Sequence, residues 1–173
     1  MVWIQTVSGN KVDLQRPDPD TIDIRDIAHA LSMLCRFCGH TYKFYSIAEH
    51  SVRVMMLVPP GQELAALLHD ASEAYIADIS RPLKSLLPDY KQVEDNFEYV
   101  INYKYGLDGK VDHKAIKKAD NIMLATEGRD LLMDTTGWNL PEPPLAIHIE
   151  PWLQQTAELH FLEQFYKYEK NSD

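Results

Sequence analysis

The run Leu-Ala-Ala-Leu-Leu-His-Asp-Ala-Ser-Glu at residues 64–73 places an imidazole and a carboxylate, those of His69 and Asp70, in an apolar helical segment. One upstream histidine, His50, and one downstream aspartate, Asp120, occur in similar apolar helical contexts. Ionisable groups are costly to bury among Leu, Ala, Val and Met, and one divalent cation can satisfy all four of them. These four residues are therefore the predicted ligands of a metal ion.

The apolar residues from about residue 22 onwards recur at steps of three and four, which indicates helices. Ser46 and Glu49 form a capping box, since each side chain can accept a hydrogen bond from an exposed backbone N–H at the start of a helix. Residues 2–7 and 11–14 are instead two short β-runs joined by Ser-Gly-Asn, which predicts a hairpin. The predicted fold is all-α with a small N-terminal β-hairpin. We expect helices over about residues 22–37, 46–58, 62–77, 81–87, 89–105, 112–133 and 150–168.

A single domain is expected, because 173 residues with 45% hydrophobic content suffice for one sizeable core and are too few for two. This domain would span residues 1–173, with a hairpin appendage at 1–16, a catalytic helical core at 22–134 and a C-terminal helix at 150–168. The aromatic residues of that last helix suit either the core or a self-association surface.

The composition excludes several classes of function. The net charge of −9 and the absence of any block of Lys or Arg would repel a nucleic-acid polymer. No apolar run approaches the roughly 20 residues of a membrane-spanning helix, and the first residues lack signal-peptide features, so we expect a cytoplasmic protein. Cys35 and Cys38 have no partner cysteine pair, and we interpret them as packed free thiols in a reducing compartment.

The predicted ligands have an acidic neighbour that could take part in catalysis. Glu73 follows His69 by one helical turn and would share its face, so it could stand beside a bound metal and move a proton. Asp78, just past the helix, could do the same. Mixed imidazole and carboxylate ligation suits one divalent ion, such as Co, Mn, Zn, Ni, Fe or Mg, and the sequence leaves the identity of the ion open.

The same residues carry a resemblance to a known family. His50, His69-Asp70 and Asp120, with the string His-Asp-Ala-Ser-Glu-Ala-Tyr-Ile-Ala-Asp at 69–78, resemble the pattern of the HD-domain phosphohydrolases. Within that family the chain is similar to the YfbR-type 5′-deoxynucleotidases and to deoxynucleoside triphosphohydrolases of phages and prophages. The likeness covers roughly residues 23–131.

This resemblance implies an HD-domain helical bundle with its divalent metal held by the four predicted ligands. It also implies catalytic roles for Glu73 and Asp78, since an acidic pair follows the His-Asp dyad in the family. Together with the aromatic last helix, it leads us to expect a homo-oligomer, a dimer or higher.

Substrate contacts are expected near the first ligand histidine. In the family, an Arg-Trp pair before that histidine contacts phosphate and sugar; Arg36 matches it, whereas Phe37 keeps a stacking face without the indole N–H donor. His40, Arg53 and Lys84 are further candidates for phosphate binding.

Other polar residues are interpreted as structural. The histidines at 29, 113, 148 and 160 have no pattern that indicates ligation. Glu127, in Glu-Gly-Arg-Asp at residues 127–130, is expected to pair with neighbours across one helix face.

The expected reaction is hydrolysis of a deoxynucleoside 5′-monophosphate to deoxynucleoside and phosphate, because no rich basic cluster is present for three phosphates. Release of triphosphate from a deoxynucleoside triphosphate remains open, as does a catalytically silent nucleotide-binding protein. Cyclic-nucleotide phosphodiesterase activity would more often bring additional histidines for a second metal ion, and only His40 is close in sequence.

Overall fold

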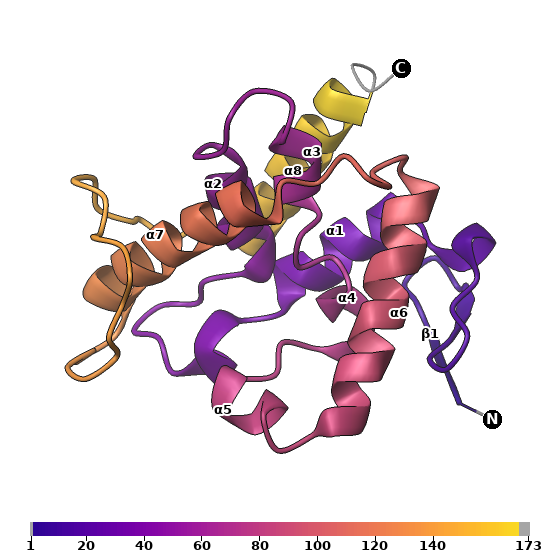
Figure 1. The fold of residues 1–173 in the computed structure, drawn as a ribbon, viewed down its shortest axis with the longest axis horizontal. Coiled ribbons are helices and arrows are strands. Elements are labelled where there is room, and N and C mark those ends of the chain that lie inside the picture. The colour runs from indigo at the N-terminus through magenta and orange to yellow at the C-terminus, as the bar shows by residue number, and fades with distance from the viewer. Residues whose placement is uncertain (1, 170–173) are drawn as a thin grey trace.

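A computed structural model describes residues 2–169, which are mostly helical and include one short antiparallel hairpin (Figure 1). The helical fold and the N-terminal hairpin predicted from the sequence are therefore confirmed. The predicted domain also included residue 1 and residues 170–173, which lie outside the described residues. In chain order the elements are β1 (Trp3–Gln5), β2 (Lys11–Asp13), the 3-10 helix η1 (Pro19–Thr21), α1 (Ile24–Met33), the 3-10 helix η2 (Arg36–Gly39), α2 (Ile47–Met55), α3 (Glu63–Leu67), α4 (Glu73–Ile76), α5 (Arg81–Lys84), α6 (Pro88–Lys104), α7 (His113–Leu131) and α8 (Gln154–Glu169).

Helix α8 lies in the centre of the helical packing. It contacts α1, α2 and α3, and Figure 1 shows it running behind α2 and α3. Its residues Ala157, Phe161 and Phe165 are almost completely buried. Burying one Phe side chain contributes about 1.5–3 kcal/mol, so α8 is a main source of stability. Of the two interpretations of the last helix, the structure supports the core.

The predicted first helix ends earlier than expected. Its apolar spacing continued to about residue 37, but α1 stops at Met33 and Leu34 has an extended backbone. Cys35 forms an isolated β-bridge with Ser46, and the amide of Ile47 donates to the carbonyl of Leu34. This pairing replaces the last helical hydrogen bonds and places Arg36 in a separate turn, η2.

The turn η2 has an unusual backbone. Phe37 and Cys38 have φ values of 55° and 53°, and Gly39 follows at 79°. Left-handed geometry costs a residue with a Cβ atom roughly 1–2 kcal/mol, so two such residues in succession store strain beside Arg36.

The predicted helix over 62–77 is broken in the middle. It divides into α3 and α4, and the residues between them form a tight turn whose amides bond three residues back, as from Glu73 to Asp70. His69 Nδ1 lies 2.7 Å from the carbonyl oxygen of Ala66. In a continuous helix the amide of Asp70 would donate to that oxygen. The side chain of His69 therefore competes with the backbone, and the His-Asp dyad lies at the break.

The remaining helices agree with the sequence apart from their ends. The helix predicted over 46–58 ends at Met55, and Pro88 begins α6 instead of closing the segment before it. Only half of the capping box forms: Ser46 accepts from the Glu49 amide, whereas the Glu49 carboxylate bonds to Arg53 and to the Trp152 amide. Within residues 2–169, no helix is both long and apolar enough to cross a membrane.

The hairpin is attached to the helices through a polar contact and an apolar one. Its turn residue Ser8 donates from both its amide and its hydroxyl to the carboxylate of Asp26 in α1. Val12 of β2 is fully buried against the core.

Candidate metal centre

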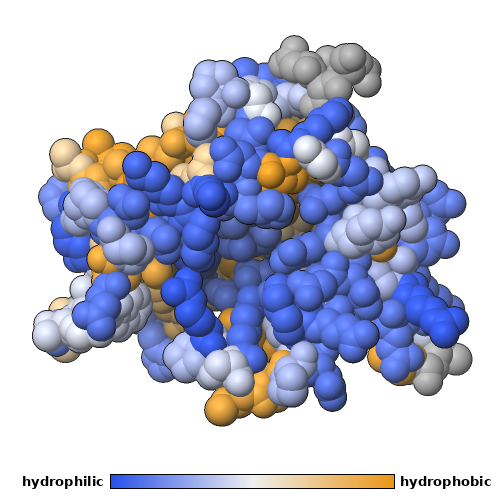
Figure 2. All heavy atoms as spheres, viewed as in Figure 1, coloured by the Kyte–Doolittle hydropathy of each residue, from blue (hydrophilic) through white to orange (hydrophobic). Residues whose placement is uncertain are grey.

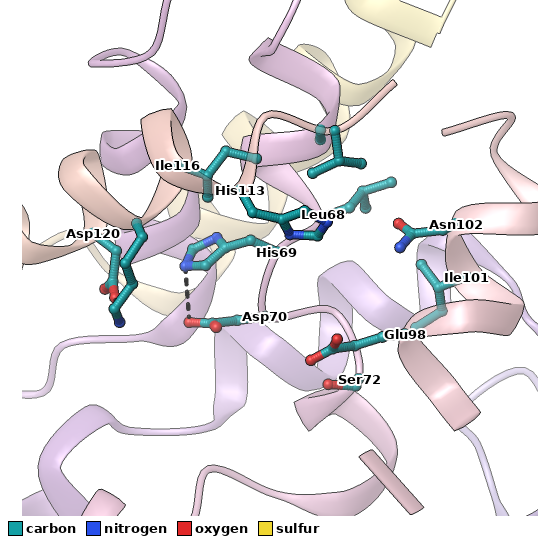
Figure 3. A pocket seen from close by; sticks show the side chains of 13 residues that line it. Leu68, His69, Asp70, Ser72, Glu98, Ile101, Asn102, His113, Ile116 and Asp120 are labelled. Atoms are coloured by element: carbon teal, nitrogen blue, oxygen red, sulfur yellow. Dashed lines mark hydrogen bonds and ion pairs between the residues drawn. The ribbon is translucent and has the colours of Figure 1, made fainter. Parts of the chain in front are cut away.

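The predicted metal ligands come together from three parts of the fold. His50 lies in α2, His69 and Asp70 lie in the break between α3 and α4, and Asp120 lies in α7. His50, His69 and Asp120 each offer one ligand atom within 4.8 Å of the others. Asp70 Oδ2 lies 3.6 Å from His50 Nε2 and 3.3 Å from His69 Nε2. Figure 3 shows His69, Asp70 and Asp120 gathered at one end of a pocket.

Both histidines present the ring nitrogen that a metal would require. His50 Nδ1 lies 2.6 Å from a carboxylate oxygen of Glu127, and His69 Nδ1 lies 2.7 Å from the Ala66 carbonyl. Each Nδ1 can therefore donate a hydrogen bond to that oxygen, which would leave the Nε2 lone pair for a metal ion at the centre. Both Nε2 atoms are buried and have no hydrogen-bond partner among residues 2–169. Two orphaned acceptors aimed at one point beside two carboxylates fit a divalent cation.

The potential at the centre is negative. Burial and the nearby guanidinium of Arg36 lower the pKa of His50. The carboxylates of Glu127 and Asp120 raise it more, so that the pKa of His50 is about 9. Carboxylates that favour a charged imidazolium would favour a bound cation for the same reason.

Glu127 supports the centre from behind. It is fully buried and accepts hydrogen bonds from His50, from the Tyr45 hydroxyl at 2.9 Å and from Arg36 Nε at 3.1 Å. Burial raises the pKa of Glu127, but Arg36 and His50 lower it by more, so the pKa lies below its ordinary value. The expectation that Glu127 pairs across its own helix face was wrong, since its three partners come from other elements. One signal could have found it: Glu127 lies two helical turns after Asp120, on the same face of α7.

Arg36 reaches the centre from η2. Its guanidinium lies 3.1 Å from Glu127 and 3.6 Å from Asp70, and 11% of its side chain is exposed. Although burial disfavours the charge, Glu127 and Asp70 raise the pKa of Arg36 far above the ordinary range. The predicted phosphate contact is thus a mostly buried cation fixed by two carboxylates. The Phe37 ring lies 5.3 Å from the Arg36 Cζ atom.

The two acidic residues predicted to be catalytic lie beside the centre. Glu73 is buried, and its Oε2 atom has no hydrogen-bond partner among residues 2–169. Burial, with Asp70 and Asp78 nearby, raises the pKa of Glu73 well above its ordinary value. Burial also raises the pKa of Asp78, which makes no hydrogen bond or ion pair with the described residues. Lys84 Nζ lies 3.7 Å from Glu73 and 2.6 Å from Glu94.

The structure does not bring the other two predicted phosphate contacts, Arg53 and His40, to the centre. Arg53 pairs with the buried carboxylate of Glu49 at 2.7 Å, and its guanidinium stacks 4.9 Å from the Trp152 ring. His40 is exposed, and its side chain makes no hydrogen bond or ion pair with residues 2–169. A role for either residue in substrate binding stays a prediction.

A cavity of about 390 Å³ opens next to the centre between α6 and α7. In Figure 3, His69 and Asp120 lie at one end and Glu98 and Asn102 of α6 at the other. Figure 2 shows the corresponding face hollowed near its middle, between the surfaces over α5, α6 and α7. Its wall also includes His113, Ser72 and Lys117, whose ammonium lies 2.6 Å from Asp120.

Sequence reasoning missed most of this wall. We interpreted His113 as structural, but it lines the cavity two helical turns before Asp120. The sequence did contain a signal for His113, because its spacing puts it on the face of α7 that carries Asp120.

The chain is similar in sequence to known proteins, although no family model matches it. It is 50% identical over 134 residues to the uncharacterized protein YfdR of Escherichia coli (strain K12), covering 78% of this chain and 75% of YfdR. The chain belongs to the YfdR family. A second relative, an uncharacterized protein of Rhodobacter capsulatus, is 34% identical over 142 residues, which cover 75% of this chain and 72% of the relative.

For this member of the YfdR family, the geometry defines what the site can do. The centre offers the Nε2 atoms of two imidazoles and two carboxylates to a cation, beside a fixed guanidinium and a buried carboxyl group with a raised pKa. Such a set can hold an anionic group against a cation and deliver a proton to it.

Proposed function

We propose that this chain is an HD-domain, metal-dependent phosphohydrolase that cleaves deoxynucleoside 5′-monophosphates. One observation carries the proposal: the Nε2 atoms of His50 and His69 are buried, directed by their Nδ1 partners toward one point, and left without hydrogen-bond partners among residues 2–169. Asp70 and Asp120 complete a ligand set that fits Mn, Fe, Co, Ni or Zn. When bound, such an ion polarises a phosphoryl oxygen and lowers the pKa of a bound water.

The side chains around the centre then have defined tasks. Arg36 would hold a phosphate oxygen and neutralise the charge that develops on it. Asp78, which has no ion-pair partner among the described residues, would orient the attacking water. The oxygen of this water would add to phosphorus as Asp78 takes one of its protons, while the bond from phosphorus to the 5′-oxygen breaks. Glu73, whose pKa is raised by burial and by the nearby carboxylates, would donate the proton that the leaving oxygen needs.

The positively charged side chains near the centre favour a substrate with a single phosphate. Near the centre, all three cations are paired: Arg36 with Glu127 and Asp70, Lys84 with Glu94, and Lys117 with Asp120. They leave little positive charge for phosphates beyond one that lies at Arg36 and the bound ion. A triphosphate would need more unpaired positive charge. Hydrolysis of a deoxynucleoside triphosphate to deoxynucleoside and triphosphate is the alternative within this class.

Product analysis tests the proposal. Metal-stripped protein is incubated with each deoxynucleoside mono- and triphosphate, with and without added Co²⁺ or Mn²⁺, and the products are separated by chromatography. We expect metal-dependent phosphate from monophosphates, loss of product in His69→Ala, and retention in His148→Ala, which changes a largely exposed histidine far along the chain from the ligands. Inorganic triphosphate would instead establish the alternative reaction. Binding of nucleotide without any product would establish a silent binding protein.

A further inference from the structure

Two aromatic rings from distant parts of the chain meet beside Arg36. Phe37 of η2 and Trp138, from the segment between α7 and α8, have ring centroids 6.1 Å apart and planes inclined by 33°. Figure 1 shows that segment, in orange, extending to the side of the fold on which the end of α7 lies. Trp138 is 41% exposed and takes no part in the hydrophobic core. Successive contacts therefore connect Asp70 to Arg36, Arg36 to Phe37, and Phe37 to the partly exposed Trp138; we call these last three side chains the row.

The inner ring of this row is held at an energetic cost. Phe37 and Cys38 both have left-handed backbones, which residues with a Cβ atom rarely adopt. Such strain persists only where the surrounding structure enforces it, and it concentrates at binding and catalytic sites. Phe37, which contacts both Arg36 and Trp138, is thus one of the two strained residues.

The outer ring is held in place through a glycine of α7. A Cβ atom at Gly128 would lie 2.8 Å from the Thr135 Cγ2 atom and 3.8 Å from the Trp138 ring. Glycine is unfavourable inside a helix, so its presence here is explained by the close approach of this turn. The Trp138 amide donates to the Thr135 carbonyl at 3.1 Å, which closes the turn. Because α7 also carries Asp120, Gly128 sets the position of Trp138 relative to the metal centre.

We propose that Trp138 is the stacking platform for the nucleobase, with Phe37 as the inner wall of the same site and Gly128 as a positioning residue. This inference rests on the proposed function and names the part of the substrate that Trp138 recognises. A nucleotide whose phosphate lies at Arg36 and the centre extends along Phe37, and the exposed indole gives its base a flat apolar surface. Since every base has a π-face, stacking of this kind accepts all four bases.

Two probes separate base recognition from phosphate recognition. The first is the phosphonate analogue of deoxyadenosine monophosphate in which CH₂ replaces the bridging 5′-oxygen, so that it cannot be hydrolysed. The second is inorganic phosphate, which has no base. Binding of each is measured by calorimetry in Mn²⁺, and Trp emission is followed during each titration.

We expect Trp138→Ala to weaken phosphonate binding roughly 5- to 100-fold and to leave phosphate binding unchanged. Trp138→Phe keeps an aromatic face and should lose less. The phosphonate should quench Trp emission in the wild type and in the control Trp3→Phe, which changes a similarly exposed indole in the hairpin, but not in Trp138→Phe. Gly128→Ala should shift the emission of Trp138 and weaken phosphonate binding alone.

Failure of the inference differs from failure of the proposed function. If Trp138→Ala leaves phosphonate binding unchanged, or weakens both probes equally, Trp138 does not stack on the base, and the phosphohydrolase proposal still stands. If the wild-type protein binds neither probe, the proposed function is wrong and the inference falls with it.

Discussion

Two neighbouring residues of α2, Glu49 and His50, belong to two buried charged clusters that are completed differently. In the Glu49 cluster (Glu49, Arg53 and Trp152), one carboxylate oxygen accepts from Arg53 and the other from the Trp152 amide. In the His50 cluster (His50, His69, Asp70, Asp120 and Glu127), both histidine Nε2 atoms lie near carboxylates but have no hydrogen-bond partner among residues 2–169. A buried cluster whose groups are all paired holds elements together, whereas one with orphaned acceptors is built to receive something else.

The two clusters also differ electrostatically. Burial raises the pKa of Glu49, and the Trp152 amide and Arg53 only partly offset this. Glu127 is equally buried, but Arg36 and His50 bring its pKa below the ordinary value. The stronger positive surroundings of Glu127 suit a residue that must stay charged to fix the orientation of His50.

The largest effect is expected from opening the His50 cluster. Added Mn²⁺ or Co²⁺ should raise the melting temperature of the wild type. His69→Ala removes a predicted ligand, so this rise should be lost and hydrolysis should fall to background. Thermal melts with and without metal, run beside product analysis, measure both. Full turnover in His69→Ala would exclude the metal mechanism.

Disrupting the Glu49 cluster should lower the stability of the fold and leave metal binding unchanged. Glu49→Gln leaves Arg53 without its carboxylate in a mostly buried site and should lower the free energy of unfolding by about 3 kcal/mol. Metal affinity should stay unchanged, because Glu49 contacts no predicted ligand side chain. Urea denaturation and a metal titration of the same protein check the two halves of this prediction, and a loss of metal affinity as large as the loss of stability would show that the clusters are not independent.

A smaller effect is expected from the support behind His50. Glu127→Gln removes the charge that orients this imidazole and should weaken metal binding roughly 10- to 100-fold. Tyr45→Phe is the matched control, since it removes a neutral donor from the same carboxylate and should change metal affinity much less. Equal affinities in the wild type and Glu127→Gln would mean that Glu127 serves packing alone.

The smallest effect is expected at a third carboxylate, that of Asp130, which extends the comparison of Glu49 with Glu127. Asp130 of α7 accepts from Arg129, His148 and the Ile149 amide, and these bonds, that of Arg129 above all, lower the pKa of Asp130. A lowered carboxyl pKa stabilises the fold above the unfolded value of about 3.9, and this contribution is lost as the pH falls toward the folded value.

Asp130→Asn should therefore cost about 1 kcal/mol at pH 7 and progressively less below pH 4. Urea denaturation of both proteins at pH 7 and pH 3 provides the measurement. A difference that stays constant between the two pH values would attribute the effect to packing instead of charge.

The sequence predicted the convergence of His50, His69 and Asp120 because isolated ionisable residues in apolar helices need a common partner. It did not predict the break at His69, since the apolar spacing of residues 62–77 suits a continuous helix. At the break, the His69 side chain occupies the Ala66 carbonyl to which a continuous helix would bond the Asp70 amide. Helical periodicity contains no information about such competition between side chain and backbone.

Contacts between distant segments were also beyond the sequence. Arg53 follows His50 closely in the chain, yet its guanidinium stacks on Trp152, which is about 100 residues away in the sequence. The meeting of Phe37 with Trp138 depends on where the chain returns after α7, and no local pattern specifies that. Glu127 and His113, by contrast, could have been found, because both lie on the face of α7 that carries Asp120.

The position of α8 has a consequence for how the protein is made. Along the described chain it is the last helix to leave the ribosome, yet it packs against α1, α2 and α3, which emerge early. Until α8 arrives, those helices expose the apolar surface that Phe161 and Phe165 later cover. The nascent chain therefore stays open to chaperones and to aggregation, and it completes this core only after α8 has emerged.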